Sequence, residues 1–155
     1  MKKTLCALMI LILIVSLVSC QETEKTLSVS VTELGEKVEE KMASETVADY
    51  DATLLLDDLG IASSLYTEYF YKVGSSDASV EEVAFFKAAD EESATTIMQK
   101  LQSRKASTES TQKDYNAENY DIAVNATVET DGLYVYMVMS ANRTDINSVI
   151  ADSFK

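Results

Sequence analysis

The feature that most constrains the fold is the alternation of apolar side chains in residues 133–140, directly after Asp131 and Gly132. Successive side chains of an extended strand point to opposite faces. The two faces predicted for this strand are Leu133, Val135, Met137 and Met139 on one side, and Tyr134, Tyr136 and Val138 on the other. An Asp-Gly pair is typical of a two-residue hairpin turn, because type I′ turns need positive φ. The segment therefore predicts a β-hairpin with residues 127–129 as its first strand, within an antiparallel sheet.

A second hairpin is predicted earlier in the chain. Residues 66–73 and 80–88 are rich in aromatic and β-branched side chains and are separated by a polar turn. Residues 86–90 correspond to residues 138–142 at an offset of 52, and each segment leads into an apolar helical stripe. We interpret this as two ββα units that form one antiparallel sheet of about four strands with helices packed on one face. The alternative is that any junction between a hairpin and a helix has this pattern.

Several helices are expected around this α+β sheet. Ser30 and Glu33 form a capping-box pattern before an N-terminal amphipathic helix that reaches about residue 44. A short helix over residues 51–60 ends at a glycine, Asp90 can cap a long helix, and a last helix follows Asn142 or Thr144. Residues 115–126 are expected to be a loop or a short helix.

The N-terminus has the pattern of a secretory signal. Lys2 and Lys3 precede the apolar residues 5–18, which are too few for the roughly 20 needed to cross a bilayer core. Ser19 and Cys20 then follow, and the segment resembles the lipobox of bacterial lipoproteins. That resemblance implies cleavage before Cys20 and a diacylglycerol on its sulfur. The alternative is an ordinary signal peptide, or an uncleaved anchor, in which Cys20 is incidental.

The domain organisation follows from this pattern: a lipoprotein signal peptide at 1–19, a tether at 20–29 and a single α+β domain at 30–155. Removal of residues 1–19 leaves 136 residues with 11 basic and 26 acidic side chains, a formal charge of −15. Such a chain is a poor ligand for nucleic acid, which requires Lys and Arg to displace counterions. The expected partners are the outer face of the cell membrane, through the N-terminal lipid, and an unknown protein or small molecule.

The residue types that are missing exclude several chemistries. The chain has no histidine, Cys6 leaves with the signal, and Cys20 is used by the lipid. Ser-His-Asp and Cys-His catalysis and histidine- or thiolate-ligated zinc are therefore excluded, and we predict no cofactor and no metal. Four acidic residues close together in sequence suggest a calcium site, but they lack the spacing of an EF-hand loop. A solvated helix end is therefore the simpler interpretation. These acids are Asp49, Asp51, Asp57 and Asp58.

Two functions from different classes are compatible with these observations. The first is a noncatalytic binding or interaction module, whose contact surface would be a tyrosine-lined sheet face. This surface would comprise Tyr69, Tyr71, Tyr134 and Tyr136. The alternative for these four tyrosines is ordinary cross-strand packing.

The second function is a carboxylate-dependent cell-envelope enzyme such as a glycoside hydrolase. Its dense acid pairs would be Glu81 with Glu82 and Asp57 with Asp58. Adjacent residues on a strand point to opposite faces, so neither pair forms an acid/base couple by itself. We therefore predict a protein that is not an enzyme.

Four segments together resemble the bacterial lipoproteins of the domain-of-unknown-function 4358 family. They are residues 55–61, 82–94, 115–120 and 132–138. The family usually has a proline in the third of these segments, and this chain has none. The resemblance implies a lipid-anchored extracytoplasmic domain and brings no catalytic residues with it.

Overall fold

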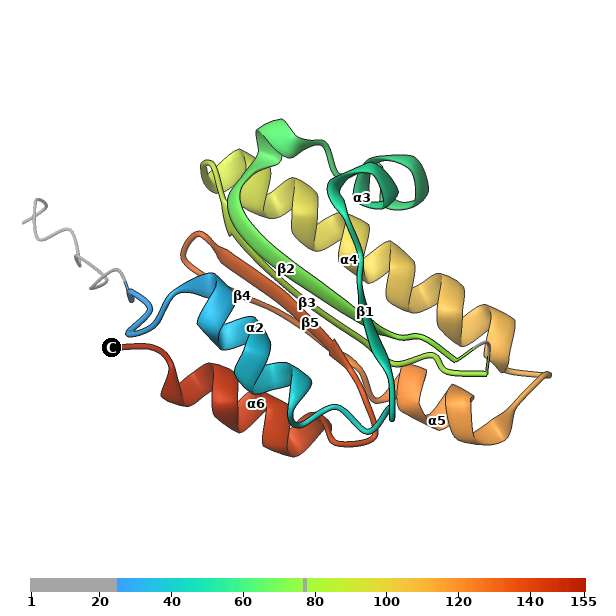
Figure 1. Ribbon diagram of the computed structural model, residues 1–155. Coiled ribbons are helices and arrows are strands. Elements are labelled where there is room, and N and C mark those ends of the chain that lie inside the picture. The colour runs from blue at the N-terminus through green and yellow to red at the C-terminus, as the bar shows by residue number, and fades with distance from the viewer. Residues whose placement is uncertain (1–24, 77) are drawn as a thin grey trace, which may run out of the picture.

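The computed structural model describes residues 25–76 and 78–155, in which helices surround one sheet (Figure 1). The predicted signal peptide and Cys20 lie outside the described residues. The elements in chain order are α2 (Val31–Glu39), β1 (Val47–Asp49), α3 (Ala52–Leu59), η2 (Ser63–Leu65), β2 (Tyr66–Gly74), β3 (Glu82–Ala88), α4 (Glu91–Gln112), α5 (Ala117–Val124), β4 (Thr127–Asp131), β5 (Tyr134–Met139) and α6 (Arg143–Asp152).

The described strands form one five-stranded antiparallel sheet in the order β1-β2-β3-β5-β4. A two-residue turn joins β4 and β5, but it is shifted by one residue from the prediction. Asp131 still pairs with Tyr134, so the turn residues are Gly132 and Leu133, and of these only Gly132 has a positive φ, 58°. Strand β3 pairs with β5 at the centre, so the two predicted hairpins lie side by side in one sheet. This confirms the α+β class and the antiparallel sheet.

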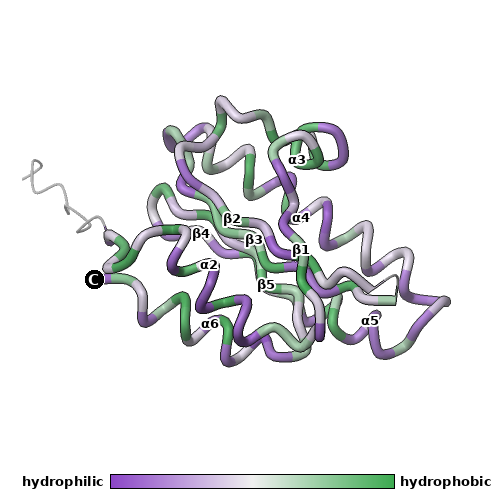
Figure 2. The backbone as a smooth tube through the Cα atoms, viewed as in Figure 1, coloured by the Kyte–Doolittle hydropathy of each residue, from purple (hydrophilic) through white to green (hydrophobic). Residues whose placement is uncertain are grey.

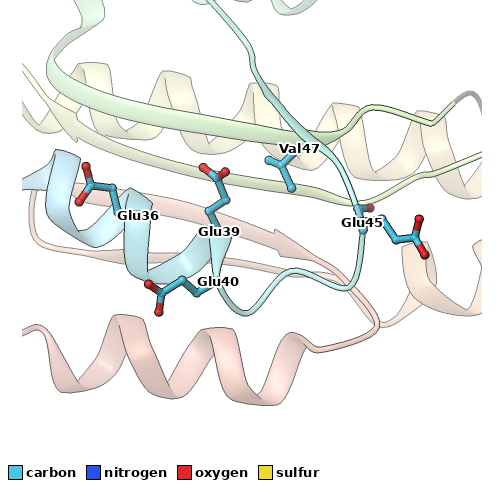
Figure 3. Close-up of a pocket in the computed structure, with 6 residues that line it drawn as sticks. Glu36, Glu39, Glu40, Glu45 and Val47 are labelled. Atoms are coloured by element: carbon cyan, nitrogen blue, oxygen red, sulfur yellow. The ribbon is translucent and has the colours of Figure 1, made fainter.

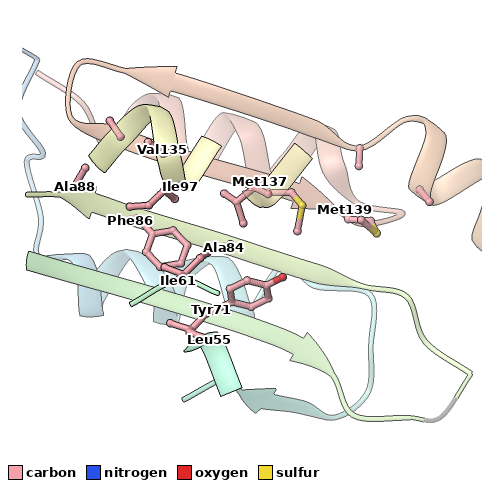
Figure 4. Close-up of a cluster of buried hydrophobic side chains, with 14 of the residues drawn as sticks. Leu55, Ile61, Tyr71, Ala84, Phe86, Ala88, Ile97, Val135, Met137 and Met139 are labelled. Atoms are coloured by element: carbon pink, nitrogen blue, oxygen red, sulfur yellow. The ribbon is translucent and has the colours of Figure 1, made fainter. Parts of the chain in front are cut away.

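Helices α3, α4 and α5 cover one face of the sheet. Ile97 and Leu101 of α4 are fully buried against it, together with Leu55 of α3 and Ala123 of α5. The strand residues of this cluster include Tyr71, Ala84, Phe86, Val135, Met137 and Met139 (Figure 4). The buried apolar side chains of α4 lie in its first half, at Ala94, Ile97 and Leu101, so apolar packing on the sheet holds this half of the helix.

Helices α2 and α6 cover the opposite face. The predicted stripe of α2, Leu34 and Val38, is fully buried, and Ile146 and Ile150 of α6 lie beside it. Their partners on the sheet include Phe70, Val83, Phe85, Tyr134 and Val138. The prediction of helices on one face is therefore wrong. Successive residues of the central strands β3 and β5 are buried, so these strands are covered on both faces. Figure 2 shows helices on either side of these strands.

The described part of the sheet has five strands, whereas about four were predicted. The additional strand is β1. This strand has three residues, and none of its side chains is buried, so it lacks a recognisable hydrophobic period. It exists through its pairing with the end of β2, from Val47 opposite Gly74 to Asp49 opposite Lys72. Long-range hydrogen bonding, not local sequence, produces it.

The helix ends follow the predicted capping chemistry in most places. The hydroxyl of Ser30 accepts from the Glu33 amide at 3.1 Å, and the carboxylate of Asp90 accepts from the Ser93 amide at 2.7 Å. Gly60 ends α3 with φ of 65°, a left-handed conformation that favours glycine. Residues 115–126, expected to be a loop or a short helix, contain α5, which Asn116 caps.

Candidate functional site

Two buried glutamates stand out among the polar residues, and both belong to the acid pair considered from the sequence. Glu81 and Glu82 are each only 5% exposed. Glu82, the first residue of β3, reaches toward α4, whereas Glu81 binds the loop that follows α2. Their contacts thus lie on opposite sides of the sheet, in agreement with the expectation that they do not form an acid/base couple.

Glu82 is the centre of a buried ion pair with α4. Arg104 donates from Nε to both carboxylate oxygens of Glu82 at 3.0 Å, and its Nη2 donates to one of them. The hydroxyl of Tyr71 donates to Glu82 Oε2 at 2.5 Å. The hydrogen bonds that Arg104 donates to Glu82 raise the pKa of Arg104. Burial, followed by the charge of Glu82, raises the pKa of Tyr71 well above its usual value. Both carboxylate oxygens of Glu82 are therefore occupied by hydrogen bonds from within the domain.

The network continues toward α3 through Tyr50. The rings of Tyr50 and Tyr71 lie with centroids 5.1 Å apart, and the hydroxyl of Tyr50 donates to Asp58. Burial, followed by the hydrogen bond to Asp58, raises the pKa of Tyr50 to about 12. These contacts connect α3, β2, β3 and α4 and hold the two helices against the sheet.

Glu81 ties together three segments that are distant in sequence. Its carboxylate accepts from the backbone amides of Ala43 at 2.8 Å and Ser44 at 2.7 Å, and from the hydroxyl of Ser140. The hydroxyl of Ser140 in turn accepts from the Asn142 amide at the start of α6. Glu81 therefore fixes the loop after α2 against the junction of β5 and α6.

An open acidic hollow of about 390 Å³ lies between α2 and β1 (Figure 3). Its lining residues are Glu36, Glu39, Glu40, Ser44, Glu45 and Val47. Lys72 lies close to it, with Nζ 2.8 Å from Glu39 and 2.7 Å from Asp49. Burial lowers the pKa of Lys72, but the hydrogen bonds to Asp49 and Glu39 outweigh it and raise this pKa overall. The charge of Glu39 is thus partly compensated within the domain.

The structure does not bring the four predicted contact tyrosines together. Tyr69 and Tyr71 pack with the α3, α4 and α5 face, where Tyr69 stacks on Phe86. Tyr134 and Tyr136 pack on the α2 and α6 face. Tyr71 and Tyr134 are buried, and the other two are partly buried. The tyrosines thus take part in cross-strand and core packing on both faces, and no common contact surface is formed by them.

The four acids considered for calcium have separate roles. Asp49 pairs with Lys72, Asp51 caps α3, and Asp58 accepts from Tyr50, whereas Asp57 is exposed. Within residues 25–76 and 78–155, no group of three or more His, Cys, Asp or Glu side chains is placed to hold a metal ion.

Two residues of the Glu82 network, Arg104 and Tyr50, were not predicted from the sequence. Arg104 lies 22 positions after Glu82, where the apolar stripe of α4 weakens. In the sequence, the only indication of this contact is an arginine on the helix that follows the strand containing Glu82. The sequence does not show that these two side chains meet, since this depends on how α4 lies across the sheet.

Comparison with known proteins identifies a family for this chain. The profile of a family described as "Domain of unknown function (DUF4358)" matches residues 36–140, about two thirds of the chain. The match extends from within α2 to the end of β5 and so includes the whole sheet. No curated protein and no solved structure gives a significant match.

Proposed function

The chain belongs to the DUF4358 family, and on that premise we propose that it is a lipid-anchored extracytoplasmic lipoprotein that acts as a noncatalytic binding or interaction module. The anchor is supported by the apolar residues 5–18 followed by Ser19 and Cys20. A diacylglyceryl cysteine supplies at least two acyl chains, the number that gives stable membrane attachment. Among the described residues, no helix has the length and apolar character needed to cross a membrane.

The noncatalytic role is carried by one observation: the carboxylates of both buried glutamates are fully used inside the domain. Glu82 is neutralised by Arg104 and hydrogen-bonded by Tyr71, and Glu81 accepts three hydrogen bonds. A general acid or base must be free to exchange a proton with a substrate, and these groups have no such freedom. A glycoside hydrolase built on this pair is therefore disfavoured.

The anchor is tested by mass spectrometry of the N-terminal peptide of the protein purified from bacterial membranes. We expect a peptide that begins at Cys20 and carries a diacylglycerol. A Cys20→Ser variant serves as the control, because it lacks the sulfur that carries the lipid. An unmodified Cys20 in the wild-type protein would contradict the proposal.

The noncatalytic role is tested by incubating the mature protein with cell-wall glycans and measuring new reducing ends. We expect none above the background of a heat-denatured sample. Release of reducing ends by the wild-type protein, lost in an Asp57→Asn or Asp58→Asn variant, would instead establish the carboxylate-dependent enzyme.

A further inference from the structure

The described chain enters the domain at one defined end, next to the C-terminus. Lys25 Nζ lies 2.6 Å from the carboxylate of Asp131, and the Lys155 amide donates to the carbonyl of Thr26 at 2.9 Å. Leu27 forms a β-bridge with Phe154. Residues 25–28, the turn at Asp131 and Gly132, and residues 154–155 together make up what we name the anchor end. The later part of the predicted tether, 20–29, is thus held on the domain.

The distance from the anchor end to the predicted lipid is short. Lys25 comes five positions after Cys20, and a fully extended chain spans at most about 3.5 Å per residue. The anchor end can therefore lie no more than about 17 Å from the lipidated cysteine.

The opposite end of the domain lies one helix length away. Ala88 donates to the carbonyl of Leu133 beside the anchor end, and α4 begins three residues later. The 22 residues of α4 span about 33 Å before the chain turns at Tyr115. Tyr115 is 84% exposed and marks what we name the far end, at the junction of α4 and α5 (Figure 1).

We propose that the domain stands end-on on the membrane, with the anchor end against the lipid headgroups and the far end directed away. This orientation rests on the lipid anchor proposed above. It commits the anchor end to one partner, the surface of a bilayer that contains anionic lipids, and leaves the far end for a protein or small-molecule partner.

Charge favours this orientation over one in which the domain lies on its α2 side. That alternative would bring the acidic hollow, with Glu36, Glu40 and Glu45, within a Debye length of about 8–10 Å of anionic headgroups. Anionic surfaces attract basic residues and repel acidic ones. The charged side chains of the anchor end are Lys25, Asp131 and Lys155. Lys25 and Asp131 pair with each other and Lys155 is exposed, so this end has no cluster of acidic side chains comparable to the hollow.

The orientation can be measured with single fluorophores, because Cys6 and Cys20 are the only cysteines of the chain. A cysteine replaces Thr130 or Lys155 near the anchor end, or Tyr115 at the far end. All three positions are exposed, so the labels should not disturb the core. The full lipoprotein is matured in a bacterial host, labelled, and reconstituted in phosphatidylcholine and phosphatidylglycerol vesicles with or without a nitroxide-headgroup lipid.

The expected result is loss of most of the fluorescence at Thr130→Cys and Lys155→Cys and little loss at Tyr115→Cys. Equal quenching at all three positions, or stronger quenching at Tyr115→Cys, would overturn the orientation. Mass spectrometry of the same samples separates the two proposals. An unlipidated Cys20 would overturn the anchor and the orientation together, whereas lipidated protein with equal quenching would overturn the orientation alone.

Discussion

Replacement of Arg104 by methionine gives the sharpest test of the internal ion pair. The side chain of Glu82 is 6% exposed and that of Arg104 is 36% exposed. Without the guanidinium, the buried carboxylate keeps the Tyr71 hydroxyl as its hydrogen-bond donor but loses its compensating charge. Methionine retains an apolar stem, so the lost charge, not lost packing, dominates the effect.

The expected loss can be estimated from the burial of the two partners. Removing one member of a fully buried ion pair costs about 3–5 kcal/mol in the free energy of unfolding. Water reaches the Arg104 side of this pair, so we expect about 2–3 kcal/mol. The neighbouring Lys105→Met is a matched control, since Lys105 forms an i,i+4 pair with Glu109 at 2.7 Å. It should cost only about 0.3–0.5 kcal/mol.

The assay is urea unfolding of the mature protein at pH 7, followed by far-UV circular dichroism. The chain has no tryptophan, so tyrosine fluorescence serves as the second probe. The double variant Arg104→Met/Glu82→Gln removes both charges and should recover part of the stability. The reasoning is refuted if Arg104→Met costs no more than Lys105→Met, or if the double variant is less stable than Arg104→Met alone.

Three further predictions concern other parts of the domain. Gly35→Ala should lower the free energy of unfolding by about 1 kcal/mol, because a Cβ at this position would lie 3.1 Å from the Phe70 ring. This loss is expected although alanine has the higher helix propensity, and a gain of stability in urea unfolding would contradict it. The raised pKa of Tyr50, about 12, means that its contribution to stability is complete below pH 10 and is lost as the pH rises toward 12. Tyr50→Phe should therefore show a smaller loss of unfolding free energy between pH 9 and pH 11.5 than the wild type, and equal slopes would argue against it. Glu81→Gln should cost about 1–3 kcal/mol and speed hydrogen exchange at the amides of residues 43–44, whereas unchanged exchange would show that Glu81 does not hold this loop.

The regular elements could be predicted wherever the signal is local. The alternation of apolar residues and the glycine of the turn indicate the hairpin of β4 and β5, although the turn lies one residue later than predicted. The capping serine and aspartate indicate the starts of α2 and α4. Strand β1 could not be predicted, since its three residues show no hydrophobic period and the strand depends on pairing with β2.

The candidate site was less predictable than the fold. The sequence indicates that Glu81 and Glu82 point apart, because side chains alternate along an extended chain. It does not indicate that Arg104 neutralises Glu82, or that Ser140 donates to Glu81 across 59 positions. Such contacts depend on the packing of α4 and α6, which no local pattern specifies.

The sequence by itself determined the class of the fold, because hydrogen bonding within turns and caps and the periods of strands and helices are local properties. Only the tertiary structure decided that α2 and α6 occupy one face of the sheet and α3, α4 and α5 the other. The physical reason is that β3 and β5 have apolar side chains on both faces, and such strands are stable only when helices remove both faces from water. That same two-sided cover divides the four tyrosines, which the sequence had suggested as one contact surface, between the two faces, and it buries Tyr71 and Tyr134.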